Sequence, residues 1–264
     1  MLVLRCAYIG LKYHGFQVQP EVPTVQGEIA KVLERLGYEK NLKYVSRTDA
    51  GVSAVDQIIS VRIVDEDILE TLNRELPGDI RIHAYTKREF SDLGILYKEY
   101  WYFAPKFLLD RILLKDAMEY ITGMKHNYIQ LIKKPTQVTI GDALMTIYVS
   151  AEMRNNFMIF RVKGKKFLWE QVRRLINLLV SVGLRRISME TFKRILNGEP
   201  YPSGIPPAPP EGLVLWRIRT RHDDEFRTII PRKEIEDWVS RHVKKAVLAA
   251  KWVLPARERR VGYD

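Results

Sequence analysis

The amino-acid sequence predicts an α+β protein made of two subdomains, each with a mostly antiparallel sheet flanked by helices. Three observations support this prediction. The chain has 264 residues, a length that suits one large domain or two small ones. Hydrophobic residues make up 46% of it and charged residues 28%, as in ordinary globular proteins. Strand-like and helix-like segments alternate in both halves, and several strands follow one another without the crossover helix that parallel pairing needs.

The first half is predicted to alternate strands and helices. Its strand-like segments, which combine β-branched and apolar residues, are residues 2–9, 58–64, 80–85 and 96–103. A turn-rich stretch at residues 10–23 precedes a helix for which Thr24 is a suitable N-cap and Gly37 a suitable C-cap. A second helix is predicted at residues 68–76. Aromatic residues alternate onto both faces of the strand at 96–103, so one of its faces must meet something other than water.

The second half begins with a predicted helix at residues 110–121. Strands follow near residues 137–148 and 157–162. The clearest helix of the chain runs from about residue 167 to residue 182. Its apolar residues fall on one stripe at about 100° per residue, and Gly183 is placed to end it.

Beyond that helix the sequence predicts one more strand between two helices. Ser188 can cap the first of these helices, which ends at Gly198. A proline-rich break leads into a strand at residues 213–219, and helical periodicity resumes at residues 231–247. The chain therefore divides into three predicted parts. They are an N-terminal subdomain at residues 1–103, a basic C-terminal subdomain at residues 104–219 and a helical C-terminal extension at residues 220–264.

The positive charge of the chain is concentrated in its second half. There are 43 Lys and Arg residues against 32 Asp and Glu residues, for a formal net charge of +11. Residues 1–132 carry 17 basic and 18 acidic side chains, whereas residues 133–264 carry 26 and 14. Such asymmetry is typical of proteins that bind a polyanion, although it can also serve solubility alone. Because no lipidation motif accompanies it, we expect nucleic acid rather than a membrane as the partner.

Several classes of chemistry lack their sequence signatures. The five histidines show no metal-ligand spacing, and the single cysteine, Cys6, can build neither a zinc site nor an internal disulfide. The sequence has no phosphate-loop, dinucleotide-binding or nucleophile-elbow motif. No apolar stretch approaches the roughly 18 residues of a membrane span, and the N-terminus lacks the pattern of a signal peptide. We therefore expect a cytoplasmic protein that uses no metal and no cofactor.

One short loop places a carboxylate close to an arginine. Residues 46–54 read Ser-Arg-Thr-Asp-Ala-Gly-Val-Ser-Ala and lie ahead of a strand-like segment. Taken alone, an aspartate two residues before a glycine is most often a turn or cap residue. Residues 47–52, however, closely resemble the signature loop of the TruA-type tRNA pseudouridine synthases.

Further segments resemble the same family and occur in the order in which the family has them. They are residues 13–17 with 24–27, residues 100–102, residues 167–174 and residues 208–213. Their letters follow the family patterns Y-x-G-F-Q with T-V-Q-G, Y-x-Y, F-L-x-x-Q-V-R and A-P-P-x-G-L. Chance rarely produces so many matches in order. The resemblance implies the pseudouridine synthase fold, with an active-site cleft between the two subdomains.

The resemblance also implies an isomerase. Members of this family convert uridine to pseudouridine in the anticodon arm of tRNA, at positions 38 to 40, without metal or cofactor, and usually act as homodimers. Such a reaction needs a carboxylate that acts on the nucleotide, a charge partner for it and a pocket for a base flipped out of the stack. Carried over by resemblance, Asp49 is the catalytic nucleophile and Arg173 its ionic partner. Tyr100 stacks on the target base and is a candidate to assist the closing proton transfer.

The surroundings of the other candidate residues suggest contacts with RNA. Arg173 falls at the boundary of the apolar stripe of its helix, where its guanidinium can face a cleft or simply be solvated. Arg47 can hold a phosphate of the flipped nucleotide or brace its own loop. The remaining residues expected to bind RNA lie in two places. Tyr13, Phe16 and Gln17 are in the N-terminal loop, where they can equally pack the fold, and Lys163, Lys165 and Lys166 are in a basic patch with Arg161, Phe160 and Phe167.

The chain departs from the family pattern at a few positions. Ser46 and Ser53 stand where the family usually has Gly and His, which changes the hydrogen bonds available near the pocket. Residues 90–94 lack an arginine that the family tends to have there. Residues 220–264, with Arg257, Arg259 and Arg260, can dock on the core or reach RNA. Two alternatives therefore stay open: a non-catalytic RNA-binding relative, and a pseudouridine synthase that acts on a different RNA site.

Overall fold

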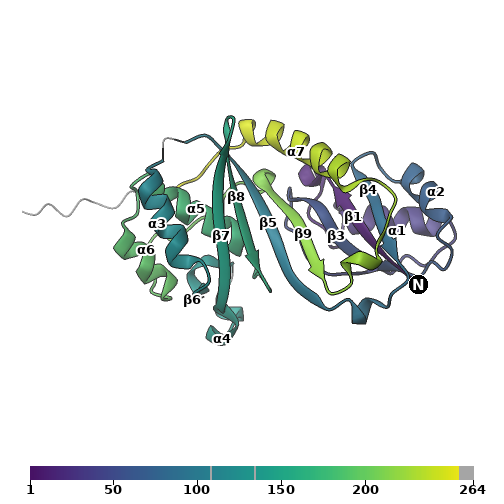
Figure 1. Cartoon of the computed structure of the whole chain (residues 1–264), viewed down its shortest axis with the longest axis horizontal. Coiled ribbons are helices and arrows are strands. Elements are labelled where there is room, and N and C mark those ends of the chain that lie inside the picture. The colour runs from purple at the N-terminus through teal and green to yellow at the C-terminus, as the bar shows by residue number, and fades with distance from the viewer. Residues whose placement is uncertain (108, 134, 256–264) are drawn as a thin grey trace, which may run out of the picture. The chain divides into compact units, whose positions relative to one another are not determined.

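A computed structural model describes residues 1–107, 109–133 and 135–255. The chain forms two compact units (Figure 1). Unit 1 comprises Met1–Trp101 and Pro210–Ala249, and unit 2 comprises Tyr102–Pro209 and the chain from Ala250 on. The chain thus returns to unit 1 after residue 209, a grouping that differs from the predicted subdomain at 104–219 and extension at 220–264. Arg257, Arg259 and Arg260 lie outside the described residues.

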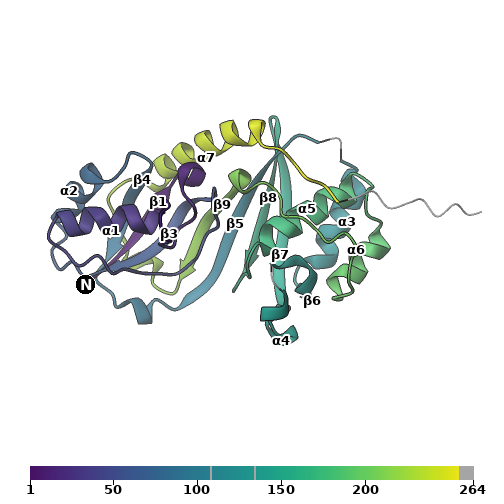
Figure 2. The same cartoon turned by 180° about the vertical axis from the view of Figure 1, so that it is seen from behind.

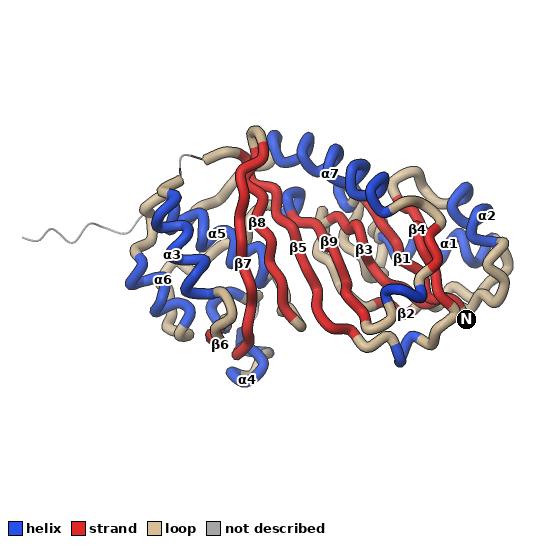
Figure 3. The backbone as a smooth tube through the Cα atoms, in the orientation of Figure 1, coloured by secondary structure: helices blue, strands red, loops and turns tan. Residues whose placement is uncertain are grey.

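The strands of unit 1 form one sheet (Figure 3). Their order is β10 (Arg227–Thr228), β4 (Ile80–Thr86), β1 (Leu2–Tyr8), β3 (Ser53–Val61), β9 (Leu213–Thr220) and β5 (Ile95–Pro105, of which 95–101 belong to this unit), and the short β2 (Lys43–Tyr44) pairs with β3. Strand β1 pairs antiparallel with β3 and β4, β2 with β3, and β10 with β4. Strands β3 and β9 run parallel, through Ser53 opposite Val214 and Ala54 opposite Leu215. The predicted α+β class with mostly antiparallel pairing is confirmed.

Three helices accompany the sheet of unit 1. They are α1 (Val25–Arg35), α2 (Ile68–Glu75) and α7 (Arg232–Ala249). Thr24 caps α1 as predicted, because its Oγ1 accepts a hydrogen bond from the backbone N–H of Gly27 at 3.2 Å. Helices α1 and α2 cover one face of the sheet, as the front and back views show (Figures 1 and 2). Helix α7 packs against β1, β3 and the turn at Pro210–Gly212.

Helix α7 answers the question left open about the C-terminal segment. Its buried residues recur every four positions, at Ile235, Val239, Val243 and Val247, and form the apolar stripe that the sequence predicted. The stripe packs against the sheet of unit 1. Residues 232–249 therefore dock on the core.

Unit 2 combines a β-hairpin with four helices. Its elements are α3 (Arg111–Ile121), β6 (Lys125–Asn127), α4 (Ile140–Ala143), β7 (Leu144–Arg154), β8 (Phe157–Gly164), α5 (Gln171–Gly183) and α6 (Met189–Leu196). The 3₁₀ turns of the chain are Gly10–Lys12, Phe90–Asp92, Ile129–Leu131, Pro135–Gln137, Pro210–Gly212 and Asp223–Glu225. Helix α5 forms the core of this unit, since nearly every one of its residues is buried. Among the described helices, none combines the length and the apolar character needed to cross a bilayer.

Two boundary predictions in unit 2 were wrong. A strand was expected at residues 137–148, but β7 begins at Leu144 because Thr139 caps the short helix α4, its Oγ1 accepting from the N–H of Asp142 at 3.1 Å. A helix was expected from residue 167, but α5 begins at Gln171. Glu170 has a φ of +61°, which a continuous α-helix does not allow, and the side chain of Gln171 accepts from the N–H of Leu168 instead.

Candidate active site

The loop that carries Asp49 lies between β2 and β3 and is held by the N-terminal loop of the same unit. The backbone N–H of Phe16 donates to the carbonyl of Thr48 at 3.2 Å, and the N–H of Gly51 donates to the carbonyl of Tyr13 at 3.1 Å. Gly15 has a φ of +98°, and a Cβ there would lie 2.7 Å from the carbonyl oxygen of Thr48. The close approach of the two loops therefore requires glycine at this position.

The aromatic residues of the N-terminal loop lie inside unit 1. Phe16 is fully buried, and its ring centroid lies 4.9 Å from that of Tyr44. Tyr13 is 6% exposed, and its hydroxyl donates to Asp79 at 2.6 Å. Both were predicted to contact RNA, whereas the structure uses both to pack the loop behind Asp49. Gln17 keeps a partly exposed side chain.

The residues beside Asp49 are fixed by buried hydrogen bonds. The hydroxyls of Thr48 and Tyr8 lie 2.7 Å apart, and burial raises the pKa of Tyr8 far above its usual value. Ser46 is held through its backbone by the side-chain amide of Gln57. Asp49 itself is only partly buried, and Arg47 is exposed. A carboxylate that reaches solvent from a rigid loop is well placed to meet a substrate.

Tyr100, on β5, lies close to this loop. It is 6% exposed, and its hydroxyl lies 2.9 Å from the Oγ of Ser46. Burial raises the pKa of Tyr100 to about 12, the hydrogen bond with Ser46 acts in the opposite direction, and the negative charge of Asp49 adds to the increase. The hydrogen bond with Ser46 places the hydroxyl of Tyr100 against the loop that carries Asp49. The structure brings together Asp49, Tyr100 and the N-terminal loop.

Arg173 occupies the first turn of α5 in unit 2 and is 7% exposed. Its guanidinium donates to the carbonyl of Ala208 at 3.1 Å and pairs with Glu170 at 3.3 Å. Burial alone would raise the pKa of Glu170, but Arg174, Arg173 and Lys133 together lower it. Arg173 is therefore a buried, bonded side chain and not the solvated helix arginine that the sequence left as an alternative.

The predicted basic patch lies on the hairpin of β7 and β8. Lys163, Lys165 and Lys166 are exposed, and Lys166 pairs with Asp142 at 3.1 Å. Arg161 pairs with Glu152. The patch thus presents several cations on the surface of unit 2, as RNA binding requires.

One aromatic residue of this patch was missed by the sequence analysis. Phe160 is fully buried, whereas Tyr148 on β7 is 50% exposed and pairs across the hairpin with Lys163. The Nζ of Lys163 lies 5.8 Å from the centre of the Tyr148 ring. The available signal in the sequence was the alternation of apolar residues at 145, 147 and 149 with Thr146, Tyr148 and Ser150, which matches the alternating burial of β7. Only the strand register, however, places Tyr148 beside Lys163.

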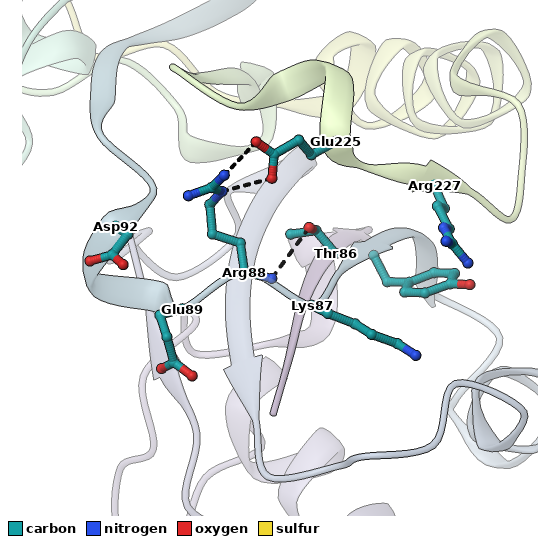
Figure 4. A pocket seen from close by; sticks show the side chains of 8 residues that line it. Thr86, Lys87, Arg88, Glu89, Asp92, Glu225 and Arg227 are labelled. Atoms are coloured by element: carbon teal, nitrogen blue, oxygen red, sulfur yellow. Dashed lines mark hydrogen bonds and ion pairs between the residues drawn. The ribbon is translucent and has the colours of Figure 1, made fainter.

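Two cavities of unit 1 lie apart from the Asp49 loop. The first, of about 370 Å³, is lined by Tyr85, Thr86, Lys87, Arg88, Glu89, Asp92, Glu225 and Arg227, and Figure 4 shows Arg88 bonded twice to Glu225 inside it. The second, of about 340 Å³, is lined by Arg5, His83, Ala84, Arg217, Arg219, Asp223, Asp224, Phe226, Thr228, Ile230 and Arg232. In both, the arginines are largely engaged by carboxylates of the same unit. Within the described residues, no group of three or more His, Cys, Asp or Glu side chains is arranged to hold a metal ion.

Comparison with known proteins gives consistent results. The family model described as tRNA pseudouridine synthase matches residues 119–220. The chain is 34% identical to the tRNA pseudouridine synthase A of Thermococcus kodakarensis, over 96% of this chain and 98% of that protein. It is 32% identical to the protein of the same name from Archaeoglobus fulgidus, over 92% and 89%. For Methanopyrus kandleri the identity is 35%, over 82% and 85%.

Solved structures give a more distant likeness. A chain of the crystal structure of a Cbf5-Nop10-Gar1 complex has a TM-score of 0.37 and 13% identity to this chain, covering 68% of it and 45% of the other. A chain of an archaeal box H/ACA Nop10-Cbf5 complex has a TM-score of 0.36 at the same identity. These values are too low to support an argument about the site.

Proposed function

This chain belongs to the family of tRNA pseudouridine synthases, isomerases that convert uridine to pseudouridine in tRNA, and we propose that its targets are uridines 38 to 40 of the anticodon arm. We further propose Asp49 as the nucleophile. The observation that carries this assignment is the loop geometry: the partly exposed carboxylate of Asp49 follows Ser46 and Thr48 in the loop, and both of those side chains are buried and hydrogen-bonded. Such a group can approach a substrate without moving its support.

The proposed isomerisation needs no oxidant or reductant. In the isomerisation, the bond between N1 of uracil and C1′ of ribose breaks, and a bond between C5 and C1′ forms. C5 loses its hydrogen, and N1 gains one. No electron leaves or enters the nucleotide, so the atoms balance without a redox partner. We assign to the carboxylate of Asp49 the attack on the nucleotide and to Tyr100 the ring against which the flipped base stacks.

We assign the remaining predicted residues by their exposure. Arg47 is exposed beside Asp49 and suits a phosphate of the flipped nucleotide. Lys163 and Lys165 are exposed on the hairpin of unit 2 and suit the tRNA backbone, with Tyr148 as an adjacent stacking surface. Arg173 is proposed as the ionic partner of the nucleophile, in addition to its pairing with Glu170.

Assembly and location are also proposals. We propose that the enzyme acts as a homodimer in the cytoplasm, as its family resemblance and its single cysteine led us to expect. Sedimentation equilibrium over a range of protein concentrations tests the first of these. A mass near the 30.9 kDa of one chain at micromolar concentration would contradict it.

The proposed reaction is tested by tritium release. The enzyme is incubated with tRNA transcripts in which only the uridines at positions 38, 39 or 40 carry tritium at C5. We expect release from these transcripts and none from matched transcripts labelled at other positions. Release only from the other transcripts would assign a different RNA site. Tight tRNA binding without any release would favour the alternative of a non-catalytic RNA-binding relative.

A further inference from the structure

Three side chains form a hydrogen-bonded chain behind the proposed base-stacking residue. The Nζ of Lys98 lies 3.0 Å from the carbonyl oxygen of Val45 and 3.4 Å from the Oγ of Ser46. The same Oγ lies 2.9 Å from the hydroxyl of Tyr100. Lys98 and Tyr100 lie two residues apart on β5, so their side chains share one face of the strand. Ser46 joins them from the loop of Asp49.

Two of the three side chains are shielded from water, and Lys98 is half-buried. Ser46 is 4% exposed and Tyr100 6% exposed. Burial lowers the pKa of Lys98. The backbone of Ser46 is also fixed, because the side chain of Gln57 accepts a hydrogen bond from its N–H and donates one to its carbonyl. A hydroxyl in such a setting cannot exchange a lost partner for water and holds its geometry.

The number of protons that each group can donate sets the direction of the hydrogen bonds between Lys98, Ser46 and Tyr100. An ammonium group only donates hydrogen bonds, so Lys98 donates to Ser46. A serine hydroxyl that accepts from an ammonium still has its own proton, which can be donated to the phenolic oxygen of Tyr100. The phenolic proton then points away from Ser46. The hydrogen bond from Ser46 lowers the pKa of Tyr100, against the larger effect of burial.

We propose that Ser46 and Lys98 are positioning residues that fix the ring and the hydroxyl proton of Tyr100 for the reaction. The inference rests on the proposed role of Tyr100 at the target base. Neither residue needs to touch the substrate. Ser46 holds the phenolic oxygen from the rigid loop of Asp49, and Lys98 orients the hydroxyl of Ser46. The nucleophile and the stacking ring are thereby tied together through one serine side chain.

The side chain of residue 46 decides whether this hydrogen-bond network can form. With glycine at position 46, as in the family pattern that the sequence resembles, the phenolic oxygen of Tyr100 loses this partner, and Lys98 keeps only the carbonyl of Val45. The chain has adopted a side chain where the pattern has none, in the loop that carries Asp49. A hydroxyl is the smallest group that can join both partners.

A double-mutant cycle on turnover tests the inference. The variants are Ser46→Ala, Tyr100→Phe and the combination of both, measured as kcat and KM for tritium release. Loss of one hydrogen bond is expected to lower kcat of Ser46→Ala by about 3- to 10-fold, with a smaller change in KM. In the Tyr100→Phe background, Ser46→Ala should cost less than about 2-fold, because the group through which it acts is gone.

Three controls keep the result interpretable. Ser46→Thr retains the hydroxyl and should restore most of kcat. Lys98→Met should behave as Ser46→Ala does, in both backgrounds. Ser60→Ala removes a buried serine hydroxyl of β3 that has no hydrogen-bond partner and should leave kcat unchanged. Equal losses from Ser46→Ala with and without the Tyr100 hydroxyl would overturn the proposal and make Ser46 a merely structural residue.

A measurement that needs no turnover separates this inference from the proposed function. With tyrosine labelled at Cζ, the NMR signal of Tyr100, assigned by its loss in Tyr100→Phe, reports the hydrogen bonding of its hydroxyl. We expect the signal to shift in Ser46→Ala and in Lys98→Met but not in Ser60→Ala. An unmoved signal would refute the positioning chain even in an active enzyme. If the NMR signal shifts as expected but the enzyme releases no tritium, the proposed function is refuted, whereas the hydrogen bonds from Lys98 through Ser46 to Tyr100 are supported.

Discussion

Asp49 and Asp56 lie seven residues apart on one segment of unit 1, yet the structure treats the two carboxylates in opposite ways. Asp56, on β3, is fully buried. Its oxygens bond Arg5 at 2.6 Å, the backbone N–H of Ile218 at 3.0 Å and Arg232 at 3.3 Å. Asp49 stands in the loop before the strand, partly exposed. The first carboxylate is satisfied by the fold itself, whereas the second keeps access to solvent and hence to a ligand.

The hydrogen bonds of Asp56 and Arg5 replace missing backbone hydrogen bonds between β3 and β9. Strand β3 pairs with β9 through Ser53 and Ala54, and the regular ladder between the two strands stops there. Asp56 accepts from the N–H of Ile218, and Arg5 donates to the carbonyl of the same residue at 3.3 Å. The ion pair therefore satisfies the backbone of β9 where strand pairing stops. Arg232 extends the network to the first residue of α7 and fastens that helix to the sheet.

The same substitution at the two positions gives the largest contrast. Asp49→Asn keeps the shape of the side chain but removes the nucleophilic charge. We expect tritium release to fall by about 10⁴-fold or more, with tRNA affinity and the free energy of unfolding nearly unchanged. Single-turnover release, tRNA binding and denaturant unfolding measure the three quantities. Equal loss of turnover and affinity would mean that the Asp49 loop is structural.

Asp56→Asn should have the reverse phenotype. The substitution leaves the buried guanidinium of Arg5 without its full counter-charge, a change that typically costs about 3–5 kcal/mol of the free energy of unfolding. Denaturant unfolding of the variant measures this loss. Turnover per folded molecule, corrected for the folded fraction, should stay within a few-fold of the wild type. A stable but inactive Asp56→Asn would break the comparison, since it would place Asp56 in the chemistry.

The sequence could predict much of the site because its motifs are local. The Asp49 loop and the N-terminal loop were both identified from short stretches of sequence, and the structure brings them together through backbone hydrogen bonds. The helices that have clear cap residues were also found, as with Thr24 at α1 and Ser188 at α6. In each case, neighbouring residues carry the physical information.

What the sequence could not predict depends on partners far apart in the chain. The bond between Ser46 and Tyr100 joins residues 54 positions apart, and the pair of Asp56 with Arg232 spans 176 positions. The return of residues 210–249 to unit 1 is of the same kind. For Tyr13 and Phe16 the sequence left RNA contact and packing both open, because an aromatic residue in a loop gives no sign of its burial, and both are buried in the structure. Such features follow from strand register and loop packing, which one sequence leaves undetermined.

The Asp56 network also predicts how stability depends on pH. Burial lowers the pKa of His83, which lines the cavity beside the network, to about 4, with Asp56 opposing the change and Arg5 and Arg232 adding to it. The native imidazole therefore stays neutral when the unfolded one, with a pKa of about 6.5, takes up a proton. This contribution to stability is complete above pH 6.5 and is lost as the pH falls toward 4.

His83→Asn isolates this effect. Between pH 7 and pH 4, the wild type should lose on the order of 3 kcal/mol more unfolding free energy than the variant. Parallel denaturant titrations at several pH values give the difference, in which the carboxylates common to both proteins cancel. Turnover of the Asp49 site should not follow the same transition. Identical pH profiles of stability in the two proteins would show that His83 is not held neutral by the fold.

The contrast between buried and exposed side chains also applies to unit 2. The prediction drawn from it has the smallest expected effect. Phe160 is fully buried, whereas Tyr148 stands half-exposed beside Lys163. Tyr148→Leu should weaken tRNA binding by about 1–3 kcal/mol, or about 5- to 150-fold in Kd, because it removes a stacking surface. Tyr148→Phe keeps the ring and should bind like the wild type.

Salt dependence then separates the ring from the charge next to it. Because Tyr148 carries no charge, Tyr148→Leu should leave the slope of log Kd against log salt unchanged. Lys163→Ala should reduce its magnitude by about 0.7–0.9, the value for one phosphate contact. Unchanged tRNA affinity in both variants would remove this face of the hairpin from the RNA-binding surface. Exposure of Tyr148 and Lys163 on the surface would then not be enough for tRNA binding.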